Sequence, residues 1–430
     1  MSSAIATGSS QQGHSPPGPS ERQNRLHSGL GRERVVAVEL RDDDEGERLV
    51  VDLARPERRV MACPGCGYRT RAVYDRAIRT WRHLDCLRTR VLLRCEVRRI
   101  DCPTCGVVTE QVPFARPGSR FTRAFEDTAV WLTRDAPKSV VARLMRVDWA
   151  TVGRMLERVV AEHDGQRADR LDGLRLIGID EVAYRKGRRY LTCVVDHETG
   201  ALVWCSEGRS GATLARFFIA LGPERCAAIE AVSVDMGAAW PPVLARFVPG
   251  ADVCIDPFHV IKLASEALDG VRRAEWQRLR REDPEGARWL KGTRFALRRR
   301  PGDLSEREQS QLADLRRENA LLYDAWLMHD QLRAVFSLRD PVAANDLLGA
   351  WIVWADDSGL APFRKAAATI AKHFDGIIAA VRLGISNARL EAMNSTVRLM
   401  SHRSCGFRRL DSLVALMRLV CGRVPVVLPT

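Results

Sequence analysis

The sequence has no uninterrupted apolar run of about 18 residues, the length that a membrane-spanning helix needs. It also lacks, at its start, the basic segment followed by an apolar segment that marks a secretory signal. We therefore expect a cytoplasmic protein with no membrane partner. Hydrophobic periodicity is missing from residues 1 to about 33, which are rich in Ser, Gly, Gln, Pro and Arg. This composition predicts a solvated, disordered tail, to which we assign residues 1–45.

Acidic residues are fewer than basic residues in this chain. The chain of 430 residues contains 54 Asp and Glu against 67 Lys and Arg, which gives a formal net charge of +13. This excess favours a polyanionic partner, and nucleic acid is the partner that we expect. An arginine-rich proteome would produce the same excess, so the placement of the charge matters more than its sum. The length allows two to four domains with sizeable cores.

Two Cys-Pro-x-Cys-Gly motifs contain four of the twelve cysteines. Each motif places two thiolates on one side of a tight loop, and the Gly that follows relieves strain where a positive φ is expected. Two such loops can hold one tetrahedral zinc ion. Disulfides are disfavoured in the cytosol, and a thioredoxin-like redox pair would be single. We therefore predict a zinc-ribbon domain over residues 46–115 with structural Zn²⁺ on four ligands: Cys63, Cys66, Cys102 and Cys105.

The segment between the two motifs mixes strand-like residues with frequent arginine, for example in residues 79–84, 88–94 and 97–100. We expect short strands whose outer face is cationic. Such a face could follow DNA phosphates, or it could protect exposed strand edges from pairing. Cys86 and Cys95 lie in this segment and are expected to be small core residues.

Helical spacing of apolar residues begins after Phe121. Residues 122–132, 139–145 and 150–160 each have this spacing, with a short break at Asp148 and Trp149 before the third segment. Three helices joined this tightly resemble a helix-turn-helix unit, which we place at residues 116–168. Its recognition helix would be the third, with Thr151 and Arg154 pointing outward to bind DNA.

An apolar run with β-branched residues at its centre covers residues 174–184 and predicts a strand that is buried on both faces. Asp180 interrupts this run, and a buried carboxylate is costly unless a cation or hydrogen bonds compensate it. Asp180 is therefore either held in place for chemistry or begins a turn toward Gly187. Because side chains alternate across a strand, Glu181 would point to the opposite face from Asp180.

Further strands are expected at residues 189–196, 201–206, 228–235 and 251–256, with helices at about 212–221 and from Met236 onward. Three antiparallel strands, a helix, a strand, a helix and a strand form the order of an RNase H-like fold. In such a fold an acid in the first strand approaches another at the end of the fourth, and Asp180 and Asp235 fit these positions. The fold class is therefore a multidomain α+β and α/β protein whose RNase H-like catalytic domain covers residues 169–425.

More than a hundred residues separate Asp256 from Glu391, too many for a loop. Residues of about 271–384 are dominated by Arg, Leu, Ala and Glu and indicate an all-helical insertion. Basic patches at residues 277–281 and 298–300 could contact DNA, or they could be solvated helix faces in an arginine-rich chain.

Four short motifs, in this order along the chain, resemble those of the DDE transposases of bacterial insertion sequences. They are Ile177-Gly-Ile-Asp-Glu181 with Lys186-Gly187 and Tyr190, then Ser233-Val-Asp-Met236, Asp256-Pro-Phe-His-Val260, and Ser386-Asn-Ala-Arg-Leu-Glu-Ala-Met-Asn394. With the cysteine motifs ahead of a helix-turn-helix, the chain from about residue 50 to 425 is similar to the ISL-three family in particular. Such proteins act on bacterial DNA, so we expect association with the nucleoid.

This resemblance implies specific roles for individual residues. The carboxylate triad of the family matches Asp180, Asp235 and Glu391, which would bind two divalent metals, Mg²⁺ or Mn²⁺, and carry out catalysis. Asp256 and His259 match an element that we expect to support the site rather than to bind metal. An alternative for these two residues is the plain start of a helix with a satisfied histidine.

Phosphodiester chemistry independently favours a cluster of three carboxylates, which can hold two cations about 3.5 to 4 Å apart. Glu391 lies on an expected helix over residues 390–400, beside an apolar stripe. Arg403, Arg408 and Arg409 surround a predicted glycine turn and could clamp phosphates. Residues 410–420 predict an apolar core helix.

The function that we predict is a transposase that binds the terminal inverted repeats of its element, cleaves the strand and transfers it to target DNA, as a homo-oligomer. The alternatives are a non-enzymatic DNA-binding regulator descended from a transposase and a nuclease without joining activity.

Overall fold

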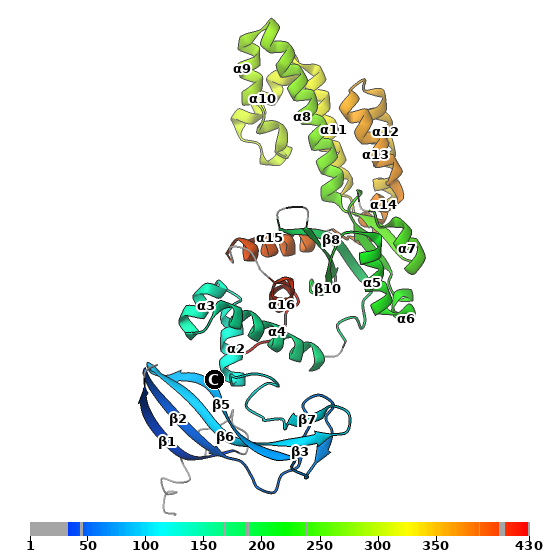
Figure 1. Ribbon diagram of the computed structural model, residues 1–430. Helices are drawn as coiled ribbons and strands as arrows, with labels where there is room; N and C mark the ends of the chain where they lie inside the picture. The colour runs from blue at the N-terminus through cyan, green and yellow to red at the C-terminus, as the bar shows by residue number, and fades with distance from the viewer. Residues whose placement is uncertain are drawn as a thin grey trace, which may run out of the picture. The chain divides into compact units, whose positions relative to one another are not determined.

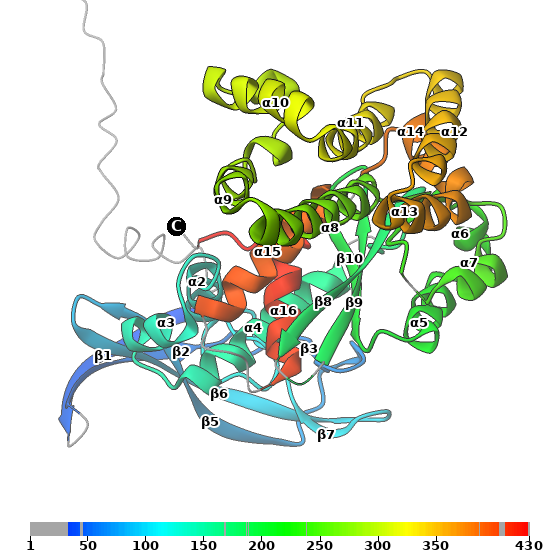
Figure 2. The same cartoon turned by 90° about the horizontal axis from the view of Figure 1, so that it is seen from above.

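The protein is described here from a computed structural model (Figures 1 and 2) that covers residues 33–43, 46–166, 169–185, 187, 189–237, 239–386, 388–403 and 409–428. The chain divides into two compact units, residues 1–162 with 425–430, and residues 163–424. None of the helices in the described part of the chain has both the length and the apolar character needed to cross a bilayer.

The first unit contains a five-stranded sheet built from β1 (Arg34–Asp43), β2 (Gly46–Ala54), β5 (Asp75–Cys86), β6 (Thr89–Cys102) and β7 (Gly106–Thr109). The strand order is β1-β2-β6-β5, and β7 pairs with β6. Its core includes Trp81 and Phe114, whose rings meet edge to face with centroids 5.2 Å apart. Two short strands, β3 (Met61–Ala62) and β4 (Arg69–Thr70), flank the first cysteine motif.

Strand β1 corrects the prediction that the tail extends to residue 45. Residues 34–43 pair antiparallel with β2, although Val36, Val38 and Leu40 are all exposed. The segment is ordered mainly by backbone pairing to β2, which is itself buried at Val50 and Val51, while Val35 alone of its apolar side chains packs against the core of the sheet. Composition alone does not reveal such a partner.

Three helices follow the sheet, as predicted: α2 (Arg123–Leu132), α3 (Lys138–Met145) and α4 (Trp149–Gln166). Thr122 caps α2 by accepting from the amide of Phe125, and α3 ends at Arg146 in the left-handed region with φ 53°. Helix α4 begins at Trp149, so the expected break is one residue shorter.

Helix α2 is tied to α4 and the preceding loop by buried Arg116, which contacts carboxylates of Glu126 at 3.3 Å, Asp127 at 2.7 Å and Glu162 at 2.7 Å.

The second unit is organised around a mixed sheet of β8 (Leu176–Arg185), β9 (Arg189–Asp196), β10 (Leu202–Glu207), β11 (Ala231–Val234) and β12 (Asp252–Ile255). The order is β10-β9-β8-β11-β12. The first three strands form an antiparallel meander, whereas β11 is parallel to both β8 and β12. Ile177 and Ile179 of β8 are fully buried, as their apolar sequence predicts.

Helices α5 (Gly211–Leu221), α6 (Pro223–Ala227) and α7 (Pro241–Phe247) connect these strands. The helix expected to begin at Met236 instead begins at Pro241, after a turn and the N-cap residue Trp240. The two successive prolines at positions 241 and 242 favour the first helical turn, where their missing N–H groups leave no hydrogen bond unmade.

The insertion is helical, as predicted, and contains α8 (Pro257–Glu282), α9 (Pro284–Gly292), α10 (Glu306–Glu318), α11 (Ala320–Val335), α12 (Pro341–Asp357) and α13 (Ala361–Lys372), with 3-10 turns η1 (Ala296–Arg298) and η2 (Pro301–Asp303). Helix α8 starts at the sheet and runs outward beside α11 (Figures 1 and 2). Helix α14 (Phe374–Leu383), which we expected in the insertion, packs on β11 and β12 through Ala379 and Ala380. It therefore belongs to the sheet layer.

Two C-terminal helices complete this unit, α15 (Ala388–Arg403) and α16 (Leu410–Val420). Helix α15 lies against β8, and α16 contacts β10. The apolar face of α16 is buried at Leu413, Leu416 and Met417, which agrees with the prediction of a core helix.

Candidate functional site

Four thiols form a compact group in the first unit. The sulfur atoms of the four cysteines in the two motifs all lie within 4.8 Å of one another. Sγ of Cys66 is 3.4 Å from Sγ of Cys102. The group fits tetrahedral zinc, because four thiolates are a common structural zinc ligand set. Gly67 and Gly106 follow the motifs with φ of 74° and 71°, as predicted.

The loops that present the thiols also influence their ionisation. The backbone amides of Cys66 and Gly65 donate to Cys63 and lower the pKa of its thiol to about 7, although burial opposes the shift. The neighbouring thiols of Cys63 and Cys66 raise the pKa of Cys105 to about 12. One prediction for this region is wrong, because Cys86 is exposed at the end of β5, whereas Cys95 is buried as expected.

In the five-stranded sheet of the first unit, several arginines form ion pairs with carboxylates of the same sheet. Arg94 Nε donates to Asp52 at 2.5 Å and Arg99 Nε donates to Asp75 at 2.7 Å. Arg82 is also paired, with Asp85. The pairs of Arg94 and Arg99 join neighbouring strands of the sheet, and all three pairs leave less free charge for DNA than the sequence suggests.

In the helix-turn-helix, the two predicted recognition residues are not equivalent. Arg154 is exposed on α4, as expected, but Thr151 is buried with 8% of its surface accessible. The Arg154 guanidinium donates to Oγ1 of Thr151 at 2.8 Å. The two residues are three positions apart on the helix, so Thr151 lies at the edge of the packed face and holds the arginine rather than pointing outward.

Asp180 lies in the middle of β8, and Asp235 directly follows the end of β11, the neighbouring parallel strand. Ser233 of β11 is paired with Gly178 of β8, so Asp235 and Asp180 each lie two residues beyond this pair. Burial raises the pKa of Asp180, and the carboxylate of Asp235 raises it further. The strand order therefore brings together the two acids that were predicted to approach each other.

Helix α15 contributes the third part of the site. Nδ2 of Asn394 donates to Oδ2 of Asp180 at 2.5 Å, and Glu391 lies about one turn earlier on the same helix. Burial raises the pKa of Glu391, and the carboxylates of Asp256 and Asp235 add to this shift. Glu391 itself is exposed, whereas Asn394 is buried.

Gly178 allows α15 to approach β8 closely. A Cβ at this position would overlap Cδ1 of Leu390 and lie 2.7 Å from Nε2 of His197. Since residues two apart on a strand share a face, Gly178 and Asp180 both point toward α15. Our sequence-based predictions gave no role to Gly178 or Asn394. The signal available for Asn394 was its position three residues after Glu391.

Asp256 is the N-cap residue of α8 and His259 lies in its first turn, as the alternative of a plain helix start predicted. Asp256 caps the helix by accepting from the amide of Phe258 at 3.3 Å. Nε2 of His259 is 2.9 Å from Oδ1 of Asp235 and 3.8 Å from Oδ2 of Asp256. The interaction with Asp235 raises the pKa of His259 although burial opposes the shift.

Asp235, Asp256 and His259 place ligand atoms within 4.8 Å of one another, a group that could hold a metal ion. Among the described residues, neither Asp180 nor Glu391 belongs to this group. Burial raises the pKa of both Asp180 and Glu391, and these two residues lie near enough to this group that its carboxylates add to the shift. Such a concentration of negative charge is what a bound cation offsets.

Of the three arginines predicted to clamp phosphates, only Arg409 can be described by its side chain. It is exposed and its guanidinium lies 3.3 Å from Asp411. The Arg403 backbone ends α15, while its side chain and Arg408 lie outside the described residues.

Three family models match the chain. One described as a transposase matches residues 177–417, one described as the helix-turn-helix domain of transposase family ISL3 matches residues 110–160, and one described as the zinc-finger of transposase IS204/IS1001/IS1096/IS1165 matches residues 59–105. The fold, the zinc group and these matches define a DNA-binding transposase, an enzyme that cleaves DNA and transfers the strand. The chain belongs to the ISL3 family of transposases.

Similar curated proteins agree with this family. The transposase for insertion sequence element IS1557 of Mycobacterium tuberculosis, from strains CDC 1551 and H37Rv, is 39% identical over 416 residues, which cover 91% of this chain and 93% of the relative. The transposase for insertion sequence element IS1001 of Bordetella parapertussis is 30% identical over 386 residues, which cover 88% of this chain and 92% of the relative. The prediction of a transposase is confirmed, and neither alternative function is favoured.

Proposed function

We propose that this transposase binds the terminal inverted repeats of its insertion sequence and that Asp180, Asp235 and Glu391 form its catalytic carboxylate site. The observation that carries the proposal is the hydrogen bond from Asn394 to Asp180. It connects the helix of Glu391 to the strand of Asp180, next to the strand that ends at Asp235. This contact supports the proposal that the three acids, which are distant in sequence, act at one end of the sheet.

The catalytic domain is proposed to have an RNase H-like fold. Numbered within this domain, the strands have the order 3-2-1-4-5, with strands 1 to 3 antiparallel and strands 4 and 5 parallel to strand 1. The sequence pattern predicted the order of these elements along the chain, three antiparallel strands followed by two strands that helices separate, but it did not predict their order in the sheet. The domain would then begin near residue 169, with the insertion reduced to α8–α13, and the zinc-ribbon domain would begin at β1 rather than at residue 46.

Mg²⁺ or Mn²⁺ is the proposed cofactor, held by the three carboxylates. Two divalent cations in such a site supply an activated attacking oxygen and stabilise the leaving oxygen. The protein's own residues fix the ligands. Asn394 orients Asp180 through one carboxylate oxygen, while the amide of Glu181 donates to the other at 2.6 Å. His259 occupies the corresponding position beside Asp235.

The proposal is tested by replacing each acid with its amide, which removes a charge and nearly preserves shape. Asp180→Asn, Asp235→Asn and Glu391→Gln should each abolish cleavage and joining of DNA from the ends of the element but leave binding of those ends intact. Glu181→Gln is the matched control, because Glu181 adjoins Asp180 on the same strand and is also half-buried. It should retain substantial activity.

A second ligand set is favoured by the proximity of Asp235, Asp256 and His259. If these residues bind the metal directly, Asp256→Asn should be as inactive as Asp235→Asn, and Glu391→Gln should cleave at nearly the wild-type rate across a range of Mg²⁺ concentrations. This pair of results would replace the proposed triad. If Asp256 and His259 support the site instead, their variants should be slowed while the Glu391 variant is inactive.

A further inference from the structure

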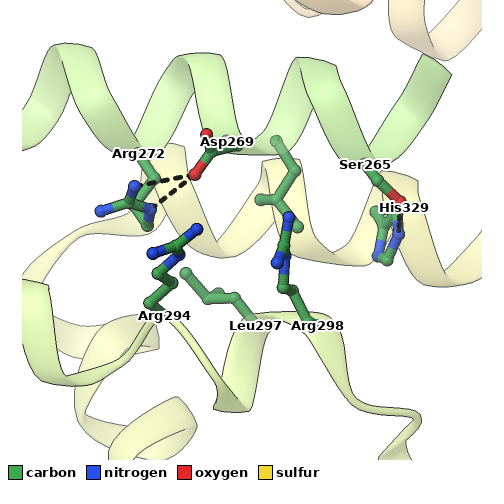
Figure 3. A pocket seen from close by; sticks show the side chains of 8 residues that line it. Ser265, Asp269, Arg272, Arg294, Leu297, Arg298 and His329 are labelled. Carbon is green, nitrogen blue, oxygen red and sulfur yellow. Dashed lines mark hydrogen bonds and ion pairs between the residues drawn. The ribbon is translucent and has the colours of Figure 1, made fainter. Parts of the chain in front are cut away.

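The helical insertion contains a narrow pocket between α8, the η1 segment and α11 (Figure 3). Helix α8 contributes Ser265, Asp269 and Arg272, which lie on one helix face because they are four and three residues apart. The turn before η1 contributes Arg294, η1 contributes Leu297 and Arg298, and α11 contributes His329. The pocket is thus built by three elements that all belong to the second unit.

Positive charge dominates the lining of this pocket. Arg272, Arg294 and Arg298 face a single carboxylate, that of Asp269. Asp269 is already engaged, since its Oδ1 accepts from Arg272 at 2.7 Å and its Oδ2 lies 3.0 Å from Nε of Arg273. Within the described part of the chain, the Arg294 and Arg298 side chains form no hydrogen bond or ion pair. Two guanidinium groups at the mouth therefore have unused donors.

The positive charge of the arginines helps to lower the pKa of two neighbouring groups, Asp269 and His329. Burial opposes ionisation of Asp269, yet bonds from Arg272 and the charges of Arg272, Arg273 and Arg294 lower its pKa. Burial lowers the pKa of His329 to about 3, and the charges of Arg333 and Arg298 contribute to the same shift. His329 is therefore neutral at physiological pH, and it adds no charge of its own.

The hydrogen bonds of His329 define its tautomer. Oγ of Ser265 donates to the carbonyl of Ile261 at 3.0 Å, so it accepts from Nε2 of His329 at 2.9 Å. Nδ1 is then an acceptor, and this buried atom has no protein partner among the described residues. An acceptor at the base of the pocket can hold a water molecule, and the cavity has room for about one.

The small volume of the pocket limits which ligands can enter it. A base or a sugar cannot enter a space of this size, but an oxyanion can sit at the mouth between the guanidinium groups, with a water beneath it. Arg272 is nearly buried, with 12% of its side chain accessible, and is held in place by Asp269. Arg294 and Arg298 are exposed and can adjust to the ligand.

We infer that this pocket is a phosphate-binding site of the insertion, which takes one backbone phosphate of the bound DNA duplex through Arg294 and Arg298. This inference rests on the proposed function, because it assumes that the DNA processed by the carboxylate site extends along the insertion. The contact reads no base, so it adds affinity without adding sequence preference.

The test compares full-length wild type with Arg294→Gln/Arg298→Gln in binding of duplexes that contain or lack the element's end, without added divalent metal. Loss of one phosphate contact should reduce the slope of log K against log[salt] by about 0.9 and weaken both duplexes equally, on the order of tenfold at physiological salt. Arg317→Gln/Arg364→Gln is the matched control, since these exposed arginines of the same insertion are paired with Asp314 and Asp356. Its slope should equal that of wild type.

An unchanged slope in the pocket variant, or an equal loss in the control, would overturn the inference. Thermal unfolding in inorganic phosphate, against chloride at the same ionic strength, distinguishes the source of the ligand. Stabilisation by phosphate that the variant loses, with no change in the DNA slope, would show a site for a free anion and would also overturn the inference. Because neither measurement involves cleavage, failure of the carboxylate proposal would leave these results interpretable.

Discussion

Replacing Gly178 by Ala probes the close approach of α15 to β8. The new methyl group would meet two groups that cannot easily move. Leu390 is fully buried, and His197 is held by Ser233, whose Oγ lies 2.7 Å from its Nε2. The backbone of Gly178 does not require glycine, because its φ is outside the left-handed region. The cost is therefore steric, and overpacking of this kind destabilises by about 1–3 kcal/mol.

The same substitution should reduce activity through Asp180. If α15 moves away from the sheet, Asn394 loses its hydrogen bond to Asp180, and Glu391 moves with the helix. A displacement of about 1 Å in a catalytic group can cost on the order of 100-fold in rate. We expect Gly178→Ala to cleave its DNA about 100-fold more slowly than wild type while it binds the ends of the element with unchanged affinity.

A double-mutant cycle identifies the cause. Leu390→Ala alone should cost about 2–5 kcal/mol, because it leaves a cavity. The double variant should cost less than the sum of the two single variants by about 1–3 kcal/mol, since the new methyl group fills part of that cavity. Urea unfolding followed by circular dichroism gives the three values, and a cleavage assay gives the rates.

Gly349→Ala is the control for this cycle. Gly349 lies in the interior of α12 with no atom near its missing Cβ, so alanine should stabilise the protein by about 0.5–1 kcal/mol and leave cleavage unchanged. If Gly178→Ala behaves like Gly349→Ala in both assays, α15 does not pack on β8 in the way described, and the role of Asn394 must be abandoned.

The remaining predictions concern the first unit. Cys102→Ser should lose bound zinc in metal analysis and weaken DNA binding, whereas a wild-type protein that contains no zinc when purified without chelator would contradict the site. Arg116→Ala should destabilise by about 3–5 kcal/mol in thermal unfolding, because it leaves the buried carboxylate of Glu126 without one of its cations; a cost below 1 kcal/mol would refute this. Burial opposes ionisation of Glu110, but bonds from Arg59 and the Arg98 amide lower its pKa below the usual 4.5. Its contribution to stability is therefore complete above that pH and lost as the pH falls below it, and a Glu110→Gln variant should lose less stability than wild type over this range.

Much of the fold followed from local patterns in the sequence. The period of apolar residues located the helices of residues 122–160 and the strands around Asp180, since these elements bury a face that alternates or repeats with the period of the structure. The position of β1 did not follow, because its side chains are largely exposed and its order comes from pairing with β2. Helix α14 resembles its helical neighbours in composition, and only its contact with β12 distinguishes it from the insertion.

The candidate site was less accessible to such reasoning. Asp180 could be noticed because an acid within a buried strand is unusual, whereas Glu391 depended on resemblance to known transposases. Thr151 was placed on the wrong face of its helix, because spacing alone does not show where the packed face ends. Gly178 and Asn394 act across more than 200 residues of sequence, and no local pattern marks a contact of that kind.

Helix α8 has a geometric consequence for the DNA. It is continuous over its 26 residues, so it forms a rigid rod of about 39 Å that starts at the acidic edge of the sheet. His259 and Arg272 are 13 positions apart, which corresponds to about 20 Å along the helix axis. At 3.4 Å for each base pair, this span equals about six base pairs of duplex. If both the proposed carboxylate site and the proposed phosphate site hold one duplex that runs along α8, this helix would set the distance in base pairs between the cut and the anchored phosphate.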